Sequence, residues 1–253
     1  MSEHYPEFVA RFYDAVYAQV RDGVDNAYYL SKMAAAGGPV LEIGSGTGRL
    51  LREALRRGID AWGIDVNPSM VARCREQLPE GQRERVSVAD AVSMRLGRRF
   101  ALAAAPFRVL SHVASVDDQL RLLDAVHEHL VPGGAFLFDV YVPNLELLLE
   151  GMPETCDFDG EWSPGRRLRR FVSSAPADLS RQTNHVSMRF VWDEADGEGR
   201  GDWEFDMRFF FRFEIEHLVA RSKLRLQALH GDFEEGPLTA GSRELVAVCR
   251  RDA

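Results

Sequence analysis

The period of the hydrophobic positions changes repeatedly along residues 38–140 and predicts alternating strands and helices. Short apolar runs of strand type are followed by stretches in which apolar residues recur at spacings of three and four. The expected strands are residues 40–43, 60–65, 86–90, 100–105 and 135–140. This alternation is typical of α/β proteins with a mostly parallel sheet. We therefore expect an α/β core over residues 38–150.

The hydrophobic pattern divides the rest of the chain into three parts. Residues 1–37 have helical spacing throughout and are expected to form an N-terminal helical cap. Residues 151–211 alternate polar and apolar positions, which is typical of an inserted antiparallel sheet. Residues 212–253 return to the core pattern, with one helix and two more strands.

Turn residues locate the strands of the insertion. Clusters of Pro, Ala, Asp and Gly at 175–178 and 196–201 predict turns. Between and beside them we expect three strands, at 166–174, 183–192 and 202–211. The final part is predicted to contain a helix over 213–222 and strands at 224–230 and 244–249.

Composition and charge limit the function classes. With 253 residues, of which 45% are hydrophobic, the chain is long enough for one domain with an insertion. The net charge is −8, and the only local basic cluster that we identify, within 166–170, is flanked by acidic residues. A nucleic-acid-binding surface usually shows more positive charge, so we do not expect a nucleic-acid substrate.

Three cysteines, Cys74, Cys156 and Cys249, are too far apart to suggest a disulfide framework or a zinc site. No apolar run approaches the ~18 residues that a membrane span requires. The first residues also lack the basic-then-apolar layout of a signal peptide. We expect a soluble, cytoplasmic protein with reduced thiols and no metal. The oligomeric state stays open, a homodimer included.

A glycine-rich segment follows the first predicted strand. Glu42, Gly44, Gly46 and Gly48 form the pattern E-x-G-x-G-x-G, and apolar residues at helical spacing come next. A dinucleotide site would show G-x-G-x-x-G, whose loop brings pyrophosphate to a helix N-terminus. A carboxylate beside the loop suits a cation better than a phosphate. The segment resembles motif I of the class I S-adenosylmethionine (SAM) dependent methyltransferases.

Two further predicted strands end in carboxylates, Asp65 and Asp90, which strengthens this resemblance over residues 38–140. An acidic residue at the second strand end can accept hydrogen bonds from ribose hydroxyls. In the family, the acidic residue at the third strand end accepts from adenine, and the next backbone N–H, here that of Ala91, contacts the ring. The fold implied is a Rossmann-like, seven-stranded, mostly parallel sheet flanked by helices, with the inserted antiparallel sheet as a lid.

The resemblance implies SAM as the cofactor and S-adenosyl-L-homocysteine as its product. Tyr13 and Tyr17 match a Y-D-x-x-Y element whose tyrosines close over the cofactor in related enzymes, although two tyrosines on one helix face can also simply pack. The full set of expected cofactor-binding residues is Tyr13, Tyr17, Glu42, Gly44, Ser45, Gly46, Gly48, Asp65, Val66, Met70, Asp90, Ala91 and Phe107.

The segment after the fourth predicted strand limits the acceptor. Methyltransferases that act on planar amines commonly show [D/N]-P-P-[Y/F] here, whereas this chain has Ala-Ala-Pro-Phe ending at Phe107. We therefore expect a small-molecule acceptor, such as an amino sugar or a secondary metabolite, methylated on oxygen or nitrogen. His112, His185 and Tyr141 are the candidate catalytic side chains. The alternatives are a catalytically silent SAM-binding protein and an NAD-dependent oxidoreductase.

Overall fold

The computed structural model describes residues 5–20 and 23–252, which fall into two compact units. One unit contains residues 23–143 and the chain from Phe209 onward. The other contains residues 144–208 together with the described residues before position 21. The predicted helical cap over 1–37 is therefore shared between the units, while positions 1–4 and 21–22 of it lie outside the described residues.

The larger unit is built on a seven-stranded sheet in the order β10-β11-β5-β4-β1-β2-β3. All neighbouring strands are parallel except β11, which is antiparallel to both β5 and β10. This arrangement confirms the predicted seven-stranded, mostly parallel sheet. The strands are β1 (Val40–Ile43), β2 (Ala61–Asp65), β3 (Val86–Val88), β4 (Phe100–Ala105), β5 (Leu130–Tyr141), β10 (Arg225–His230) and β11 (Glu244–Arg250).

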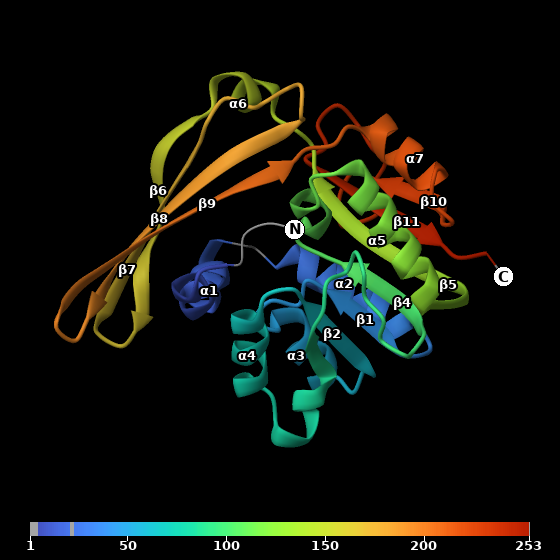
Figure 1. The fold of residues 1–253 in the computed structure, drawn as a ribbon, viewed down its shortest axis with the longest axis horizontal. Helices are drawn as coiled ribbons and strands as arrows, with labels where there is room; N and C mark the ends of the chain where they lie inside the picture. The colour runs from blue at the N-terminus through green and yellow to red at the C-terminus, as the bar shows by residue number, and fades with distance from the viewer. Residues whose placement is uncertain (1–4, 21–22, 253) are drawn as a thin grey trace. The chain divides into compact units, whose positions relative to one another are not determined.

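Helices cover both faces of this sheet (Figure 1). One face is packed by α2, α3 and α4 and the other by α5 and α7, and each face has its own cluster of buried apolar side chains. The helices are α2 (Val24–Ala35), α3 (Arg49–Arg56), α4 (Pro68–Gln77), α5 (Val116–His129) and α7 (Arg212–Ala220), with 3-10 turns η1 (Glu80–Arg85) and η2 (Val109–His112). Apolar residues on both faces of the strands explain why their runs are nearly continuous in sequence.

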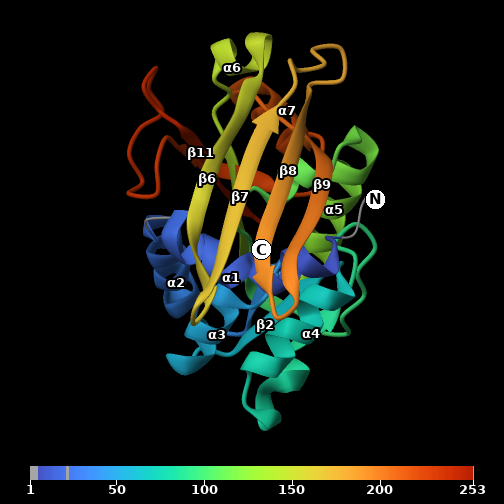
Figure 2. The same ribbon diagram turned by 90° about the vertical axis from the view of Figure 1, so that its left-hand side faces the viewer.

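The smaller unit contains a four-stranded antiparallel sheet, α1 (Glu7–Val20) and α6 (Leu145–Glu150). Its strands lie side by side in the order β6 (Met152–Ser163), β7 (Arg166–Ser174), β8 (Thr183–Glu194) and β9 (Gly197–Arg208) (Figure 2). The prediction of three strands was therefore wrong, because β6 was missed. The turn predicted at 196–201 was also wrong beyond residue 196, since β9 begins at Gly197.

Aromatic packing holds α1 against this sheet. Phe8 contacts Phe190 and Trp192, with ring centroids 5.3 and 5.7 Å away. A Cβ on Gly199 would lie 2.3 Å from the Trp192 ring, and one on Gly201 would lie 2.7 Å from the Phe8 ring. The two glycines therefore let aromatic rings lie directly on the backbone of β9.

No helix among the described residues has the length and apolarity that crossing a membrane would require.

Candidate active site

The glycine loop joins β1 to α3 at the edge where β1, β2 and β4 end. The N–H groups of Gly44 and Ser45 both donate to the carbonyl of Ile64, at 2.8 and 2.9 Å, which ties the loop to the end of β2. Gly44, Gly46 and Gly48 have φ values of 74°, 54° and 85°, in the left-handed region that favours glycine. The sequence pattern of three alternating glycines therefore reflects backbone conformation.

The three glycines differ in how much room a side chain would have at each position. A Cβ on Gly44 would lie 2.5 Å from Val109 Cγ2, and one on Gly48 would lie 2.3 Å from Cys74 Sγ. A Cβ on Gly46 would meet nothing within 4 Å. The outer two glycines are thus required by the protein's own packing, whereas the backbone at Gly46 borders open space where a ligand can approach.

Glu42 is a buried carboxyl beside this loop. It is the third of the four residues of β1 and is 1% exposed. Among the described residues, its Oε2 atom has no hydrogen-bond partner. Burial raises the pKa of Glu42 well above its usual range, and the nearby Arg49 only partly offsets this. A buried acceptor without a partner is costly. Glu42 is therefore suited to a ligand that brings a positive charge or a hydrogen-bond donor.

Asp65 ends β2 and contacts the same loop. Its Oδ2 accepts from the Gly46 N–H and its Oδ1 from the Asn67 N–H, both at 2.8 Å. Burial raises the pKa of Asp65, while these two hydrogen bonds oppose the shift. Its negative charge also contributes to the raised pKa of Glu42, so the two carboxyls are close enough to interact. The structure thus brings both predicted carboxyls to the glycine loop.

The residues after Asp65 start α4. Asn67 caps the helix, because its side-chain oxygen accepts from the Ser69 and Met70 N–H groups. Val66 is exposed, at 39%, whereas Met70 is 1% exposed and packed inside the protein. Val66 is therefore accessible to an adenine ring, while the Met70 side chain would need to move to contact one.

Asp90 lies two residues beyond the end of β3, which is shorter than predicted. Its Oδ1 accepts from the Val92 N–H at 2.9 Å, and both Asp90 and Ala91 are half-buried. The carboxyl is held by this local turn. Its expected contact with adenine stays a prediction.

Asp139 is a site residue that the sequence analysis missed. It is buried near the end of β5, and its carboxylate accepts from the backbone N–H groups of Phe107 and Arg108, at 2.9 and 3.2 Å. The Tyr29 hydroxyl donates to the same carboxylate at 2.6 Å. Phe107 and Arg108 have φ values of 61° and 65°, which side chains rarely adopt. Asp139 therefore holds a strained turn directly after β4.

The turn also positions Phe107 next to the glycine-loop helix. The Arg49 guanidinium lies 4.3 Å from the centre of the Phe107 ring. Arg49 is the first residue of α3, and its positive charge lowers the pKa of Glu42. The loop after β4 and the loop after β1 are thus linked through Arg49.

The predicted catalytic groups in the larger unit are weak bases or acids. His112 ends η2, and burial lowers its pKa to about 4. Tyr141 ends β5, and burial raises its pKa to about 12. Its hydroxyl has no hydrogen-bond partner in the part of the chain that the structure describes. The Arg108 guanidinium lies 5.2 Å from the Tyr141 ring and forms a 2.8 Å ion pair with Glu244. Both groups are therefore neutral at neutral pH.

The remaining predicted residues lie in the smaller unit. Tyr13 and Tyr17 pack together on α1, with ring centroids 4.3 Å apart, and the Tyr17 ring lies beside the buried guanidinium of Arg170. His185, on β8, is exposed, and its 2.8 Å contact with Asp206 raises its pKa. The expected roles of Tyr13, Tyr17 and His185 in cofactor binding or catalysis stay predictions.

Among the described residues, no group of three or more His, Cys, Asp or Glu side chains is arranged to hold a metal ion.

Residues 40–134 match the model of a family described as a methyltransferase domain. No curated protein sequence matches the chain. The fold is similar to that of an S-adenosylmethionine-dependent methyltransferase from Clostridium acetobutylicum, with 17% identity, 98% of each chain covered and a TM-score of 0.77.

Two further solved structures have the same fold over nearly their whole length. The CcbJ methyltransferase from Streptomyces caelestis is 24% identical, with 98% of this chain and 100% of that chain covered and a TM-score of 0.75. The sugar N-methyltransferase KedS8 from a Streptoalloteichus species is 18% identical, with 100% and 95% covered and a TM-score of 0.76. The similarity therefore includes the inserted sheet as well as the core, and it confirms the predicted fold class.

Proposed function

We propose that this chain, which has the class I methyltransferase fold and a methyltransferase domain at residues 40–134, transfers a methyl group from SAM to an oxygen or nitrogen of a small molecule. We further propose an amine nitrogen, as in an amino sugar, as the preferred acceptor. The observation that carries the proposal is the buried, unpartnered Oε2 of Glu42 beside a glycine loop whose middle residue borders open space.

The residues at this edge of the sheet fit SAM and fit a dinucleotide poorly. SAM carries an ammonium group and a sulfonium group, and it has no phosphate. Glu42 supplies a buried carboxyl with a spare acceptor, whereas a pyrophosphate carries only acceptor oxygens and could not donate a hydrogen bond to it. By the resemblance, Asp65 would hold the ribose hydroxyls, and Asp90 with Ala91 would hold the adenine.

When bound, SAM supplies a methyl group that its sulfonium already activates for displacement. The protein's contribution is then to hold the acceptor atom in line with that methyl, a proximity effect worth up to ~7–11 kcal/mol in favourable cases. The strained turn at Phe107 and Arg108, fixed by Asp139, is the element of the larger unit that we assign to this positioning.

The state of His112 favours an amine over a hydroxyl. A hydroxyl acceptor benefits from a general base whose pKa lies near the working pH. Because burial lowers the pKa of His112 to about 4, this side chain is a weak base at neutral pH. A neutral amine reacts through its own lone pair and does not need such a base. The KedS8 neighbour, described as a sugar N-methyltransferase, is in keeping with this choice.

Parallel calorimetric titrations with SAM, S-adenosyl-L-homocysteine and NAD test the cofactor. We expect micromolar binding of the first two and none of NAD. Release of S-adenosyl-L-homocysteine is then measured with pairs of sugars that differ only in one amino or hydroxyl group. Turnover of the amino member supports the proposal.

Three outcomes would contradict it in different ways. Binding of NAD alone would overturn the cofactor assignment. Preferential turnover of hydroxyl acceptors would overturn the choice of nitrogen. SAM binding without turnover across amine and hydroxyl libraries would favour the catalytically silent SAM-binding protein.

A further inference from the structure

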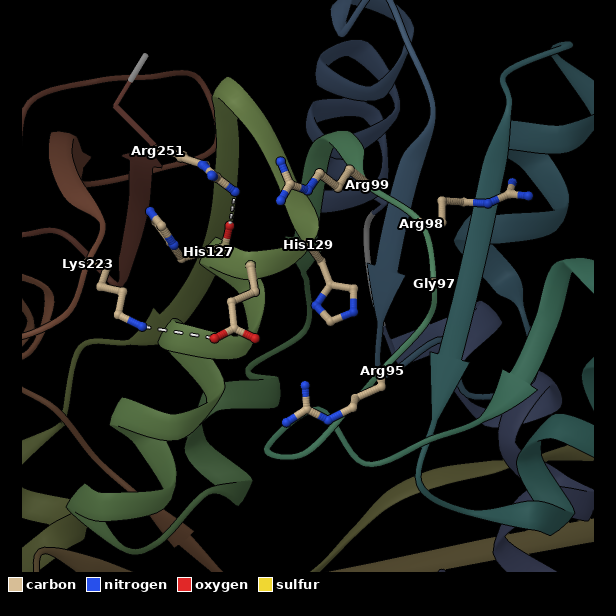
Figure 3. Close-up of a pocket in the computed structure, with 9 residues that line it drawn as sticks. Arg95, Gly97, Arg98, Arg99, His127, His129, Lys223 and Arg251 are labelled. Atoms are coloured by element: carbon tan, nitrogen blue, oxygen red, sulfur yellow. Dashed lines mark hydrogen bonds and ion pairs between the residues drawn. The ribbon is translucent and has the colours of Figure 1, made fainter.

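A cavity lies at the amino ends of the parallel strands, on the side of the seven-stranded sheet away from the glycine loop. It has a volume of about 610 Å³ and is formed by the loop before β4, the end of α5, and the residues that follow α7 and β11 (Figure 3). Since β1 and β4 are parallel, the amino end of β4 is the edge away from the glycine loop. The proposed methyltransferase function makes no use of this cavity.

The charge of the lining is opposite to that of the whole protein. Five of the lining side chains are cationic, Arg95, Arg98, Arg99, Lys223 and Arg251, against a single carboxylate, Glu128. The formal charge of the lining is therefore +4 (five minus one), on a chain whose net charge is −8. Concentrated charge of one sign in a concave surface attracts ions of the other sign.

Two of these arginines have no counter-ion among the residues that the structure describes. Among the described residues, neither the Arg95 nor the Arg99 side chain has a recorded ion pair or hydrogen bond, and both are exposed. Figure 3 shows both side chains extending toward the end of α5, where Lys223 and Arg251 lie, whereas Arg98 points the other way. The Arg98 guanidinium is placed 3.5 Å from the centre of the Trp62 ring.

The other cations are held in place by the end of α5. Arg251 Nη1 donates to the carbonyls of His127 and Leu130, at 2.9 and 2.8 Å. Lys223 Nζ lies 3.9 Å from both Asp124 and Glu128. Lys223 is thus partly neutralised, while the Arg251 contacts within the described residues are to backbone carbonyls.

His129 fixes the loop that carries the unpaired arginines. Its Nδ1 contacts the Ala125 carbonyl at 2.7 Å, and its Nε2 accepts from the Leu96 N–H at 3.0 Å. These two bonds require a neutral imidazole, with the proton on Nδ1. The backbone between Arg95 and Arg99 is therefore attached to α5. This attachment keeps the two guanidinium groups at the cavity even when no ligand is bound.

We propose that this cavity is a binding site for a small oligophosphate, that is, for an anion with two or more linked phosphate groups. Guanidinium groups bind phosphate through paired N–H donors. The three arginines Arg95, Arg99 and Arg251 carry more positive charge than the one carboxylate of the lining can balance. A concave site of this volume suits a compact anion. A nucleic acid would be expected to need a basic surface that extends well beyond the cavity, on a protein less acidic than this one.

Calorimetric titration of the whole protein with tripolyphosphate at low ionic strength tests the site. We expect saturable binding of one equivalent, which weakens as salt is added. The double variant Arg95→Ala/Arg99→Ala should raise the Kd about tenfold or more, because it removes both unpaired guanidinium groups. Both residues are exposed, so the variant is expected to fold.

A matched control distinguishes the effect of the cavity arginines from the effect of a change in net charge. Arg73→Ala/Arg83→Ala removes the same charge from one half-buried and one exposed position that do not line the cavity, and should leave the Kd within about twofold. The proposal fails if tripolyphosphate does not bind saturably, or if the control weakens binding as much as the cavity variant. It also fails if an oligonucleotide binds through Arg95 and Arg99 while tripolyphosphate does not. None of these results depends on methyl transfer.

Discussion

The hydroxyl of Tyr29, on α2, donates a 2.6 Å hydrogen bond to the carboxylate of Asp139, on β5, inside the larger unit. Both side chains are buried, and the same carboxylate accepts from the backbone of Phe107 and Arg108. One hydrogen-bonded carboxylate thus joins a helix, a strand and a strained turn. Burial and the adjacent carboxylate raise the pKa of Tyr29 well above its usual value, which keeps the hydroxyl protonated as a donor.

We predict that Tyr29→Phe lowers the free energy of unfolding by about 1.5–3 kcal/mol, because it removes a donor from a buried carboxylate. The neighbouring Tyr28 gives a matched control, since its buried hydroxyl has no hydrogen-bond partner among the described residues. Tyr28→Phe should leave the free energy of unfolding unchanged within about 0.5 kcal/mol, or raise it. Urea denaturation of the three proteins measures both effects. Equal losses of unfolding free energy in the two variants would show that the hydrogen bond to Asp139 does not stabilise the protein.

The glycine loop gives a prediction that distinguishes a glycine required for packing from one that leaves room for a ligand. Gly48→Ala should destabilise the protein by about 1–3 kcal/mol more than Gly46→Ala, because its Cβ would overlap Cys74 Sγ. Gly58→Ala is the control for left-handed strain alone, with a φ of 76° and nothing within 4 Å. Urea denaturation measures stability, and calorimetry measures SAM affinity.

We expect Gly46→Ala to match Gly58→Ala in stability but to lose SAM affinity, whereas Gly58→Ala should bind SAM normally. An unimpaired affinity in Gly46→Ala would contradict the placement of the ligand against this backbone.

Glu42 gives a pH-dependent prediction. Its pKa is raised in the folded state, so the folded protein binds more protons than the unfolded chain above the ordinary value of 4.5. The contribution of Glu42 to stability is therefore greatest below that value and declines as the pH rises toward the folded pKa. Glu42→Gln lacks this decline.

The free energy of unfolding of Glu42→Gln, relative to the parent protein, should then increase between pH 5 and pH 8. Urea denaturation without SAM at both pH values measures it. If the difference in unfolding free energy between the two proteins does not change with pH, burial does not raise the pKa of Glu42.

Asp65 gives a test of the ribose assignment. Asp65→Asn keeps the shape of the side chain but removes the charge, and should weaken SAM binding by about tenfold, equivalent to ~1.4 kcal/mol. Asp60→Asn, before β2 begins, is the control and should bind SAM as the parent does. Calorimetry with both variants decides the point. Parental affinity in Asp65→Asn would show that the end of β2 does not contact the ribose.

The core was predictable because its strands are buried on both faces. Each gives a short apolar run, as at β1, where all four residues are buried. Parallel strands also end at one edge, so Glu42 and Asp65 could be placed together from sequence order alone. Asp139 follows the same rule near the end of β5, and an acidic residue near that strand end was the signal available. Its contacts depend on the pairing of β4 with β5, which local sequence does not encode.

The inserted sheet was harder to predict because its stabilising contacts are between strands. β6 is rich in acidic residues and reads poorly as a strand, but its carboxylates pair with arginines of β7, as in Asp157 with Arg170 and Asp159 with Arg167. Gly199 and Gly201 indicated a turn in sequence. In the structure they lie within β9, where aromatic rings occupy the space that side chains would fill.

The late position of β11 in the chain has a consequence for synthesis. β11 lies between β5 and β10, and its residues leave the ribosome about a hundred residues after those of β5. Until then β5, with Phe136, Leu137 and Phe138, is an apolar edge strand that lacks its neighbour on one side. Such an edge is prone to pair with other chains. The nascent protein is therefore most vulnerable to aggregation just before β11 is made, and changes that weaken β11 should lower the soluble yield.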